Sequence, residues 1–272
     1  MKKIHFFSEK VVIVTGASSG IGQQLAVHLA RYGAKLALAA RNVQKLEHVA
    51  RECHQQGAQT LVVATDVTQQ PQCENLIKRT VDEFGCIDTL INNAGVTMCA
   101  RFDEMQDLTA MEQIMRVNYF GSSYCTYYAL PYLKKSNGTL VGISSLTGKT
   151  GVPTRSFYAA SKHAMAGFFD SLRIELADSG VSVTMVYPGF VATEVRKRAF
   201  GTNSTSSGRS PLNEPEVMTA ETCAQLILNA TAQRKRELVM TFGGRLGLWL
   251  KLIAPGLTDR IARRAIKNIQ GD

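Results

Sequence analysis

Residues 11–22, VVIVTGASSGIG, decide the fold of this chain. The first five residues are apolar or β-branched and predict a buried strand, and residues 21–32 have the apolar spacing of a helix. Between them, Gly16, Gly20 and Gly22 let the backbone turn tightly and approach a phosphate, and the start of the helix offers free N–H groups. This strand–turn–helix context predicts a dinucleotide-binding site.

The glycine turn opens an alternation that continues along the chain. Strand-like runs lie at residues 11–15, 35–40, 60–65, 87–91, 139–144, 181–187 and 237–241. Helical spacing lies at residues 21–32, 43–56, 71–84, 109–133, 156–178 and 219–232. Several strands are continuous apolar runs, which is typical of strands buried on both faces. We therefore expect an α/β fold: a doubly wound (Rossmann) parallel sheet of about seven strands with helices on both faces, in a single domain over residues 1–242.

The composition is that of a globular protein with a basic surplus. Apolar residues make up 45% of the 272 residues, which excludes a disordered chain, a collagen-like repeat and a disulfide-stabilised miniprotein. The net charge of +9 favours a polyanion, a phosphorylated ligand or an anionic membrane as partner. Nine basic and three acidic residues lie within 234–272, which places +6 of that charge in the tail. A nucleic-acid partner is not expected, because this cluster lacks interleaved aromatics and a base-reading motif.

The six cysteines, at positions 53, 73, 86, 99, 125 and 223, follow no disulfide or metal-binding pattern. They form no Cys-x-x-Cys pair and have no histidine at metal-ligand spacing, so we expect reduced thiols and no metal. The start of the chain has no apolar stretch long enough for a signal peptide, and no run of 18 apolar residues predicts a transmembrane helix. These observations predict a cytoplasmic protein.

Arg41, directly after the second predicted strand, indicates which dinucleotide is bound. An enzyme that prefers NAD usually has an acid here to hold the ribose 2′-OH, and residues 39–42 contain none. A guanidinium suits the 2′-phosphate of NADP, and Ser18 and Asn42 could add hydrogen bonds. The alternative is a solvated arginine that begins a helix.

Tyr158, Lys162 and Ser145 form a second constellation. Tyr158 and Lys162 lie four apart on a predicted helix and so share one face, and Ser145 follows the fifth predicted strand, where open parallel sheets place their sites. Reducing a carbonyl by hydride leaves an alkoxide that needs a proton, and a free tyrosine has a pKa of about 10. A nearby ammonium lowers that pKa towards the operating pH. Ser144 is an alternative to Ser145 if the strand end shifts.

These motifs together resemble the short-chain dehydrogenase/reductase family over about residues 10–195, through the Gly-x-x-x-Gly-x-Gly spacing, Asn92-Asn93-Ala94-Gly95 and the Tyr158/Lys162 pair. The resemblance implies a catalytic tetrad of Asn118, Ser145, Tyr158 and Lys162. In it, Tyr158 is the general acid, Ser145 stabilises the charge on the substrate oxygen, and Asn118 holds a water that links Lys162 to solvent.

The resemblance also implies the residues that bind NADP(H). Asp66 would accept from the adenine amino group with Val67 against the ring, and the 187–193 segment would hold the nicotinamide. The full set is Gly16, Ser18, Ser19, Gly20, Ile21, Gly22, Arg41, Asn42, Asp66, Val67, Asn93, Ala94, Gly95, Tyr158, Lys162, Pro188, Gly189, Val191 and Thr193.

The expected activity is NADPH-dependent reduction of a ketone or aldehyde to an alcohol, on a small hydrophobic substrate. The alternatives are a 3-oxoacyl-thioester reductase of fatty-acid metabolism and a non-catalytic NADPH-binding sensor. Residues 190–218 predict a mobile loop over the substrate, because 201–215 is rich in Gly, Ser, Thr, Asn and Pro. Candidate pocket residues are Leu146, Val152, Phe190 and Phe200, together with Thr97, Met98 and Phe157, for any of which core packing is an equal alternative.

Residues 243–272 predict a basic amphipathic extension. A dense apolar stretch at 246–253 ends at Pro255-Gly256. On the helix that follows, one arc carries Arg260, Arg263, Arg264 and Lys267, and the opposite arc carries Ile261, Ala262, Ala265, Ile266 and Ile269. This pattern is compatible with a helix that lies on an anionic bilayer. The alternative is that its apolar face covers a dimer partner or the substrate pocket. It is similar to membrane-attached reductases of the hydroxysteroid dehydrogenase-like branch, and we expect a homodimer or homotetramer.

Overall fold

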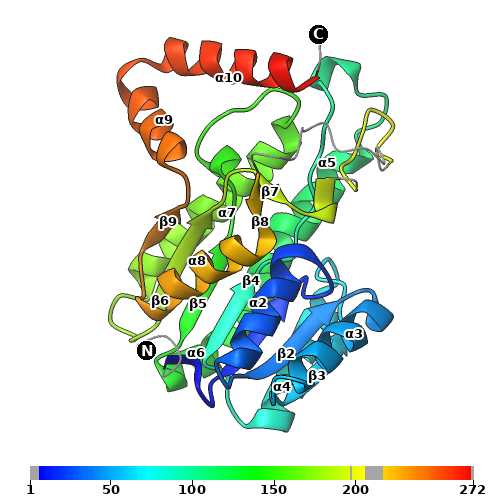
Figure 1. The fold of residues 1–272 in the computed structure, drawn as a ribbon, viewed down its shortest axis with the longest axis vertical. Coiled ribbons are helices and arrows are strands. Elements are labelled where there is room, and N and C mark those ends of the chain that lie inside the picture. The colour runs from blue at the N-terminus through cyan, green and yellow to red at the C-terminus, as the bar shows by residue number, and fades with distance from the viewer. Residues whose placement is uncertain (1–5, 197, 206–216, 271–272) are drawn as a thin grey trace.

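A computed structural model describes residues 6–196, 198–205 and 217–270 of the chain. Its centre is a seven-stranded sheet in the order β3-β2-β1-β4-β5-β6-β9, and each pairing between neighbouring strands in it is parallel (Figure 1). The strands are β1 (Val11–Thr15), β2 (Lys35–Ala40), β3 (Thr60–Ala64), β4 (Thr89–Asn92), β5 (Thr139–Ile143), β6 (Ser182–Tyr187) and β9 (Glu237–Val239). This order confirms the predicted doubly wound fold, with its reversal between β1 and β4.

Helices cover both faces of the sheet. One face carries α2 (Gly20–Arg31), α3 (Val43–His54) and α8 (Ala220–Ala232), and the other carries α4 (Gln70–Phe84), α6 (Gly121–Ser136) and α7 (Ser156–Glu175). The side chains of β1 alternate between the two resulting cores: Val12 and Val14 pack on the first, and Ile13 packs on the second. Because both faces are buried, the strands need apolar residues at successive positions, which explains their continuous runs.

The long helix expected at 109–133 is interrupted in the structure. It divides into α5 (Thr109–Met115), a π-helical turn η2 (Arg116–Phe120) and α6. A π turn adds one residue to the hydrogen-bonded ring and is frequent at functional sites. Here it contains Asn118, whose buried side chain bonds to the turn after β4. The apolar spacing continues through the turn, so periodicity alone predicts one helix.

The segment after β6 folds back over the carboxyl ends of the strands. Two short strands, β7 (Val191–Ala192) and β8 (Met218–Thr219), pair in parallel and hold its two ends together. Between them lies the 3-10 turn η4 (Glu194–Arg196), and Phe200 forms a bridge with Met98. Residues 206–216 of the predicted mobile loop lie outside the described residues. Other 3-10 turns are η1 (Phe102–Glu104) and η3 (Leu146–Gly148).

The tail forms two helices beyond the end of the sheet, α9 (Phe242–Ile253) and α10 (Pro255–Gln270), shown in orange and red in Figure 1. The predicted break at Pro255-Gly256 is therefore the start of the second helix. The side chains of Ala265, Ile266, Lys267 and Ile269 lie outside the described residues. Within the described chain, no helix combines the length and apolar character needed to span a membrane.

Candidate active site

A cavity of about 500 Å³ opens at the carboxyl ends of the central strands, where the strand order reverses. All but two of the residues predicted for cofactor binding and catalysis line it. The exceptions are Gly22 and Asn118, which pack behind the lining. The chain therefore brings the glycine turn, Arg41 and the Tyr158/Lys162 pair to one cavity, although more than 120 residues separate Arg41 from Lys162 in the sequence.

The glycine turn after β1 has no room for side chains. Gly16 and Gly20 have φ of +66° and +58°, the left-handed region that favours glycine. A Cβ on Gly22 would lie 2.2 Å from the carbonyl oxygen of Gly16, closer than any real contact. Gly22 therefore lets α2 pack directly on the turn, and it leaves Gly16, Gly20 and the first residues of α2 facing the cavity.

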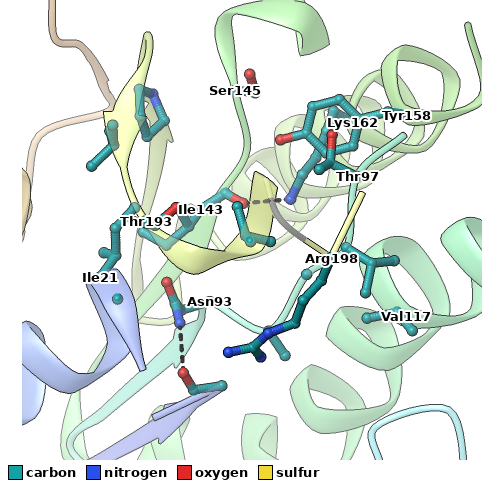
Figure 2. Close-up of a pocket in the computed structure, with 18 of the residues that line it drawn as sticks. Ile21, Asn93, Thr97, Val117, Ile143, Ser145, Tyr158, Lys162, Thr193 and Arg198 are labelled. Carbon is teal, nitrogen blue, oxygen red and sulfur yellow. Dashed lines mark hydrogen bonds between the residues drawn. The ribbon is translucent and has the colours of Figure 1, made fainter. Parts of the chain in front are cut away.

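Thr15 and Asn93 join the ends of β1 and β4. The Thr15 hydroxyl oxygen accepts from the backbone N–H groups of Asn93 and Ala94, each at 3.0 Å. The Asn93 amide nitrogen donates to the Thr15 carbonyl oxygen at 2.9 Å and to the Gly16 carbonyl oxygen at 3.3 Å. The second of these bonds is the dashed line at Asn93 in Figure 2. These bonds fix the turn that carries Gly95, so this wall of the cavity is held by the backbone of two neighbouring strands.

Polar groups surround the far end of the cavity, where β2 and β3 end. Arg41 is exposed, and Asn42 caps α3 by accepting from the Lys45 N–H at 2.9 Å. One carboxylate oxygen of Asp66 accepts from the N–H and hydroxyl of Thr68, at 3.0 and 2.9 Å. The side chains of Asn42 and Asp66 are thus held by their own chain while they line the cavity.

Lys162 occupies the opposite end. Its ammonium donates at 2.8 Å to the carbonyl oxygen of Ile143, the last residue of β5 (Figure 2). The side chain is buried, and burial lowers the pKa of Lys162 to about 8 because the charged form loses its hydration. A lysine poised near neutral pH is a group that exchanges protons readily.

Tyr158 lies one helical turn before Lys162 on α7, with its ring partly buried. Burial raises the pKa of Tyr158, while a hydrogen bond with Ser145 and the positive charge of Arg155 lower it. The raised pKa differs from the expectation that Lys162 brings it down. The reason is that the phenol is desolvated and the cation that acts on it is Arg155.

The two candidate serines point to different partners. Ser145 lines the cavity, bonds Tyr158 and accepts from the Thr147 N–H at 3.3 Å. The Ser144 hydroxyl is buried and donates to the backbone carbonyl of Lys162 at 3.2 Å. The geometry therefore favours Ser145 as the group that meets a substrate, and Ser144 as a brace between β5 and α7.

Asn118 is fully buried behind Gly95 and Lys162. Its amide accepts from the Val96 N–H at 2.9 Å and donates to the Val96 carbonyl and the Ser161 hydroxyl at 3.0 and 2.9 Å. A Cβ on Gly95 would lie 3.2 Å from the amide oxygen of Asn118, so Gly95 and Asn118 pack tightly. Asn118 therefore ties the turn after β4 to α7.

The comparisons with known proteins agree with this geometry. A family model described as short chain dehydrogenase matches residues 10–204, which is more than half of the chain. The chain belongs to the short-chain dehydrogenase/reductase family. It is 36% identical to "11-beta-hydroxysteroid dehydrogenase 1A" of Arabidopsis thaliana over 92% of this chain and 73% of the relative. It is also 36% identical to "Dehydrogenase/reductase SDR family protein 7-like" of Dictyostelium discoideum, over 95% and 82%.

The names of these relatives place this chain in the hydroxysteroid dehydrogenase-like branch of the family. A similar solved structure is an alcohol dehydrogenase from Thermococcus sibiricus complexed with 5-hydroxy-NADP. It has a TM-score of 0.72 and 26% identity, over 85% of this chain and 95% of that one. The predicted family, branch and sheet are therefore confirmed, and the chain belongs to a family of oxidoreductases.

The structure divides the candidate substrate-pocket residues: Met98 and Phe157 take the core packing given as their alternative, and Phe200 differs from the prediction. Thr97, Leu146, Val152 and Phe190 line the cavity, as expected. Met98, Phe157 and Phe200 instead form a separate apolar cluster that packs against the Tyr158 ring. A backbone bridge between Met98 and Phe200 holds their two segments side by side.

Three charged residues of the cavity escaped the sequence analysis. Arg155 contacts the Thr97 hydroxyl at 2.8 Å and the Met98 carbonyl, which places its charge near Tyr158. Glu194 and Arg198 come from the segment after β7 and also line the cavity. Charged residues in loops usually face solvent, and no periodic pattern marks these three, so the sequence carried no signal for them. Among the residues that the structure describes, no group of side chains could hold a metal ion.

Proposed function

We propose that this enzyme reduces a ketone or aldehyde to an alcohol with NADPH. The observation that carries the proposal is one cavity with a proton-donating cluster, Ser145, Tyr158 and Lys162, at one end and a phosphate-binding turn with Arg41 at the other. The glycine cradle fits a dinucleotide, because a Cβ on Gly16 would lie 2.9 Å from Ala94 and a side chain would fill the space. NADPH supplies the hydride when it is bound.

The residues of this chain would supply binding, orientation and the proton. Ser145 donates a hydrogen bond to the substrate oxygen and stabilises its developing negative charge. Tyr158 gives its phenol proton to that oxygen as the carbonyl carbon accepts the hydride, so the alkoxide is neutralised as it forms. Lys162 holds the ribose hydroxyls and favours the tyrosinate that remains. Asn118 keeps the water path that resupplies the proton.

Arg41 supports NADPH over NADH. Its guanidinium is placed to meet the 2′-phosphate, with Ser18 and Asn42 beside it in the same cavity. The archaeal alcohol dehydrogenase of similar fold is complexed with an NADP derivative, which also supports this choice. For the adenine we propose Asp66 and Val67, and for the nicotinamide carboxamide Val191 and Thr193.

The substrate we propose is a hydrophobic carbonyl compound. Leu146, Val152 and Phe190 line the catalytic end of the cavity, and the names of several relatives refer to hydroxysteroids. The test is a panel of steroid, aliphatic and aromatic ketones and aldehydes with NADPH and with NADH, followed by the absorbance of the reduced nicotinamide. Turnover of 3-oxoacyl thioesters in preference to free ketones would indicate the fatty-acid reductase. Cofactor binding without any turnover would indicate a sensor.

For the tail we propose peripheral contact between a cytoplasmic enzyme and an anionic bilayer. Large apolar side chains on α9 are exposed to solvent, among them Trp249 at 67% and Ile253 at 81%. Arg260, Arg263 and Arg264 on α10 are exposed as well. Apolar and basic residues together on a surface complement acyl chains and anionic headgroups.

We propose a homodimer or homotetramer as the assembly. Exposed apolar residues on η2, α6 and α7 (Phe120, Tyr127 and Ile174) offer a surface for a second copy. Light scattering on the purified protein tests this proposal.

A further inference from the structure

The carboxylate of Glu194 holds two cations at once. One of its oxygens, Oε2, lies 3.4 Å from the ammonium of Lys45 and 2.5 Å from the guanidinium of Arg198. Lys45 belongs to the first turn of α3, whereas Glu194 and Arg198 belong to the segment after β7. The cluster therefore joins two parts of the chain that are 149 residues apart, and about half of each side chain is exposed.

The cluster lies beside the proposed 2′-phosphate site. Glu194 and Arg198 line the same cavity as Arg41 and Asn42. Lys45 comes four residues after Arg41, and its N–H is the group that Asn42 caps. Figure 2 shows Arg198 extending from the segment after β7 into the pocket. Two cations, Arg41 and Arg198, and the Glu194 carboxylate thus line the cavity, and Lys45 joins them through its ion pair with Glu194.

The charges of Glu194, Lys45 and Arg198 indicate which anion the two cations bind best. Arg198 and Lys45 both lower the pKa of Glu194, so its carboxylate is charged at neutral pH. It offers one negative charge to two positive ones, Lys45 and Arg198. A phosphate monoester carries about two negative charges near pH 7 and more acceptor oxygens, so it suits Arg41, Lys45 and Arg198 better than one carboxylate does.

We propose that Glu194 is a built-in competitor of the cofactor's 2′-phosphate: its carboxylate holds Lys45 and Arg198, and the phosphate takes these cations from it. This inference rests on the proposed use of NADPH. Because Glu194 can recapture the cations, it speeds release of the oxidised cofactor. Lys45 and Arg198 become determinants of NADPH specificity in addition to Arg41.

The test is equilibrium titration of the full-length protein with NADPH and with NADH, monitored by calorimetry at low salt. Exposed ion pairs are individually weak, so we expect Glu194→Gln to tighten NADPH binding about three- to fivefold and to leave NADH binding almost unchanged. Lys45→Gln and Arg198→Gln should each weaken NADPH binding by a similar factor. In the Arg198→Gln background the effect of Glu194→Gln should shrink, because the two residues share one interaction.

Glu47→Gln, which removes an exposed acid from the same helix as Lys45, is the matched control. Weaker or unchanged NADPH binding in Glu194→Gln would overturn the inference, because the carboxylate would then clamp the cofactor or ignore it. Equal tightening of NADPH and NADH would overturn the assignment to the 2′-phosphate. If the wild type binds NADH better than NADPH, or neither, the proposed function fails and this inference falls with it.

Discussion

The ammonium nitrogen of Lys162 lies 5.8 Å from the centre of the Tyr158 ring, one helical turn further along α7. Its hydrogen bond to the carbonyl of Ile143 fixes it from the end of β5. A strand end and a helix face thus hold the two proton-bearing groups in a set relation. Tyr158 and Lys162 are therefore held at a fixed separation in the same cavity.

Tyr158→Phe should abolish carbonyl reduction and leave NADPH binding intact. The substitution removes the phenol proton and keeps the ring that packs against the cluster of Met98 and Phe157. General acid catalysis contributes about 10²–10⁴-fold to rates, so we expect kcat to fall by that factor. Single-turnover absorbance measures the reaction, and calorimetry measures binding. The control is Tyr127→Phe on α6, an exposed tyrosine; a Tyr158→Phe enzyme with normal kcat would exclude this mechanism.

Substitutions of Ser144 and Ser145 should affect different properties, one mainly stability and the other mainly kcat. Ser145→Ala removes the donor that faces the cavity and should lower kcat about 10²–10³-fold without loss of stability. Ser144→Ala removes a buried hydrogen bond to the Lys162 carbonyl and should cost about 1 kcal/mol of unfolding free energy, with a smaller change in kcat. Steady-state kinetics and chemical denaturation distinguish the two variants. The opposite result would assign the catalytic role to Ser144.

Reduction should slow as the pH rises through about 8. Burial lowers the pKa of Lys162 to about 8, so the ammonium is present below this pH and is lost above it. The neutral amine has no proton to pass on and no charge that stabilises the tyrosinate left after proton transfer, so kcat for reduction falls. Alcohol oxidation, which needs the tyrosinate as its base, loses the support of the same charge. Pre-steady-state rates between pH 6 and 10 measure both directions. A flat profile for reduction would mean that the charge of Lys162 is not needed.

The sheet and the main cavity were predictable from sequence, because they depend on local patterns. Continuous apolar strands and the glycine turn specify a parallel doubly wound sheet, and the strand ends then meet at one edge. Most of the predicted strand and helix ends lie close to those in the structure. The π turn at Asn118 was missed, because one extra residue in a helix leaves the apolar spacing nearly unchanged.

Contacts between distant segments were beyond the sequence analysis. Glu194 meets Lys45 across 149 residues, and neither position stands out by spacing or composition. Met98 and Phe200 likewise come from two distant segments that meet at a backbone bridge and pack in one apolar cluster. Nor did the Tyr158/Lys162 spacing predict that the phenol is desolvated beside Arg155.

Gly22→Ala should unfold the phosphate-binding turn. Its Cβ would lie 2.2 Å from the Gly16 carbonyl oxygen and 2.7 Å from the Asn93 amide nitrogen, and the Gly16 backbone cannot move away without distorting the turn. We expect NADPH binding to be lost and the unfolding free energy to fall by about 2 kcal/mol or more. Gly167→Ala on α7 is the control, because a Cβ there meets no atom within 4 Å and alanine favours the helix. Thermal unfolding and NADPH titration of both variants provide the comparison.

Membrane contact through α9 and α10 is best tested with variants that leave the catalytic end of the cavity unchanged. α9 packs on the loop next to Ser145: the Lys251 ammonium donates to the Lys149 carbonyl at 2.7 Å, and Gly244 lies against Leu146. Deleting residues 243–272 should leave NADPH binding intact but would also disturb this loop. Charge reversal of three exposed arginines on α10, Arg260→Glu, Arg263→Glu and Arg264→Glu, avoids that effect.

The wild type should float with vesicles that contain phosphatidylserine, and the triple reversal should not. Each basic residue near an anionic surface contributes about 1 kcal/mol, so loss of three weakens partitioning about a hundredfold or more. Lys78→Glu with Arg79→Glu on α4 is the control for charge reversal outside the tail, because both are exposed on a helix of the main body. Neutral vesicles should bind less of the wild type.

If the wild type never floats, the exposed Trp249 and Ile253 face a protein surface instead, and light scattering of a Trp249→Ser variant should then show a smaller assembly.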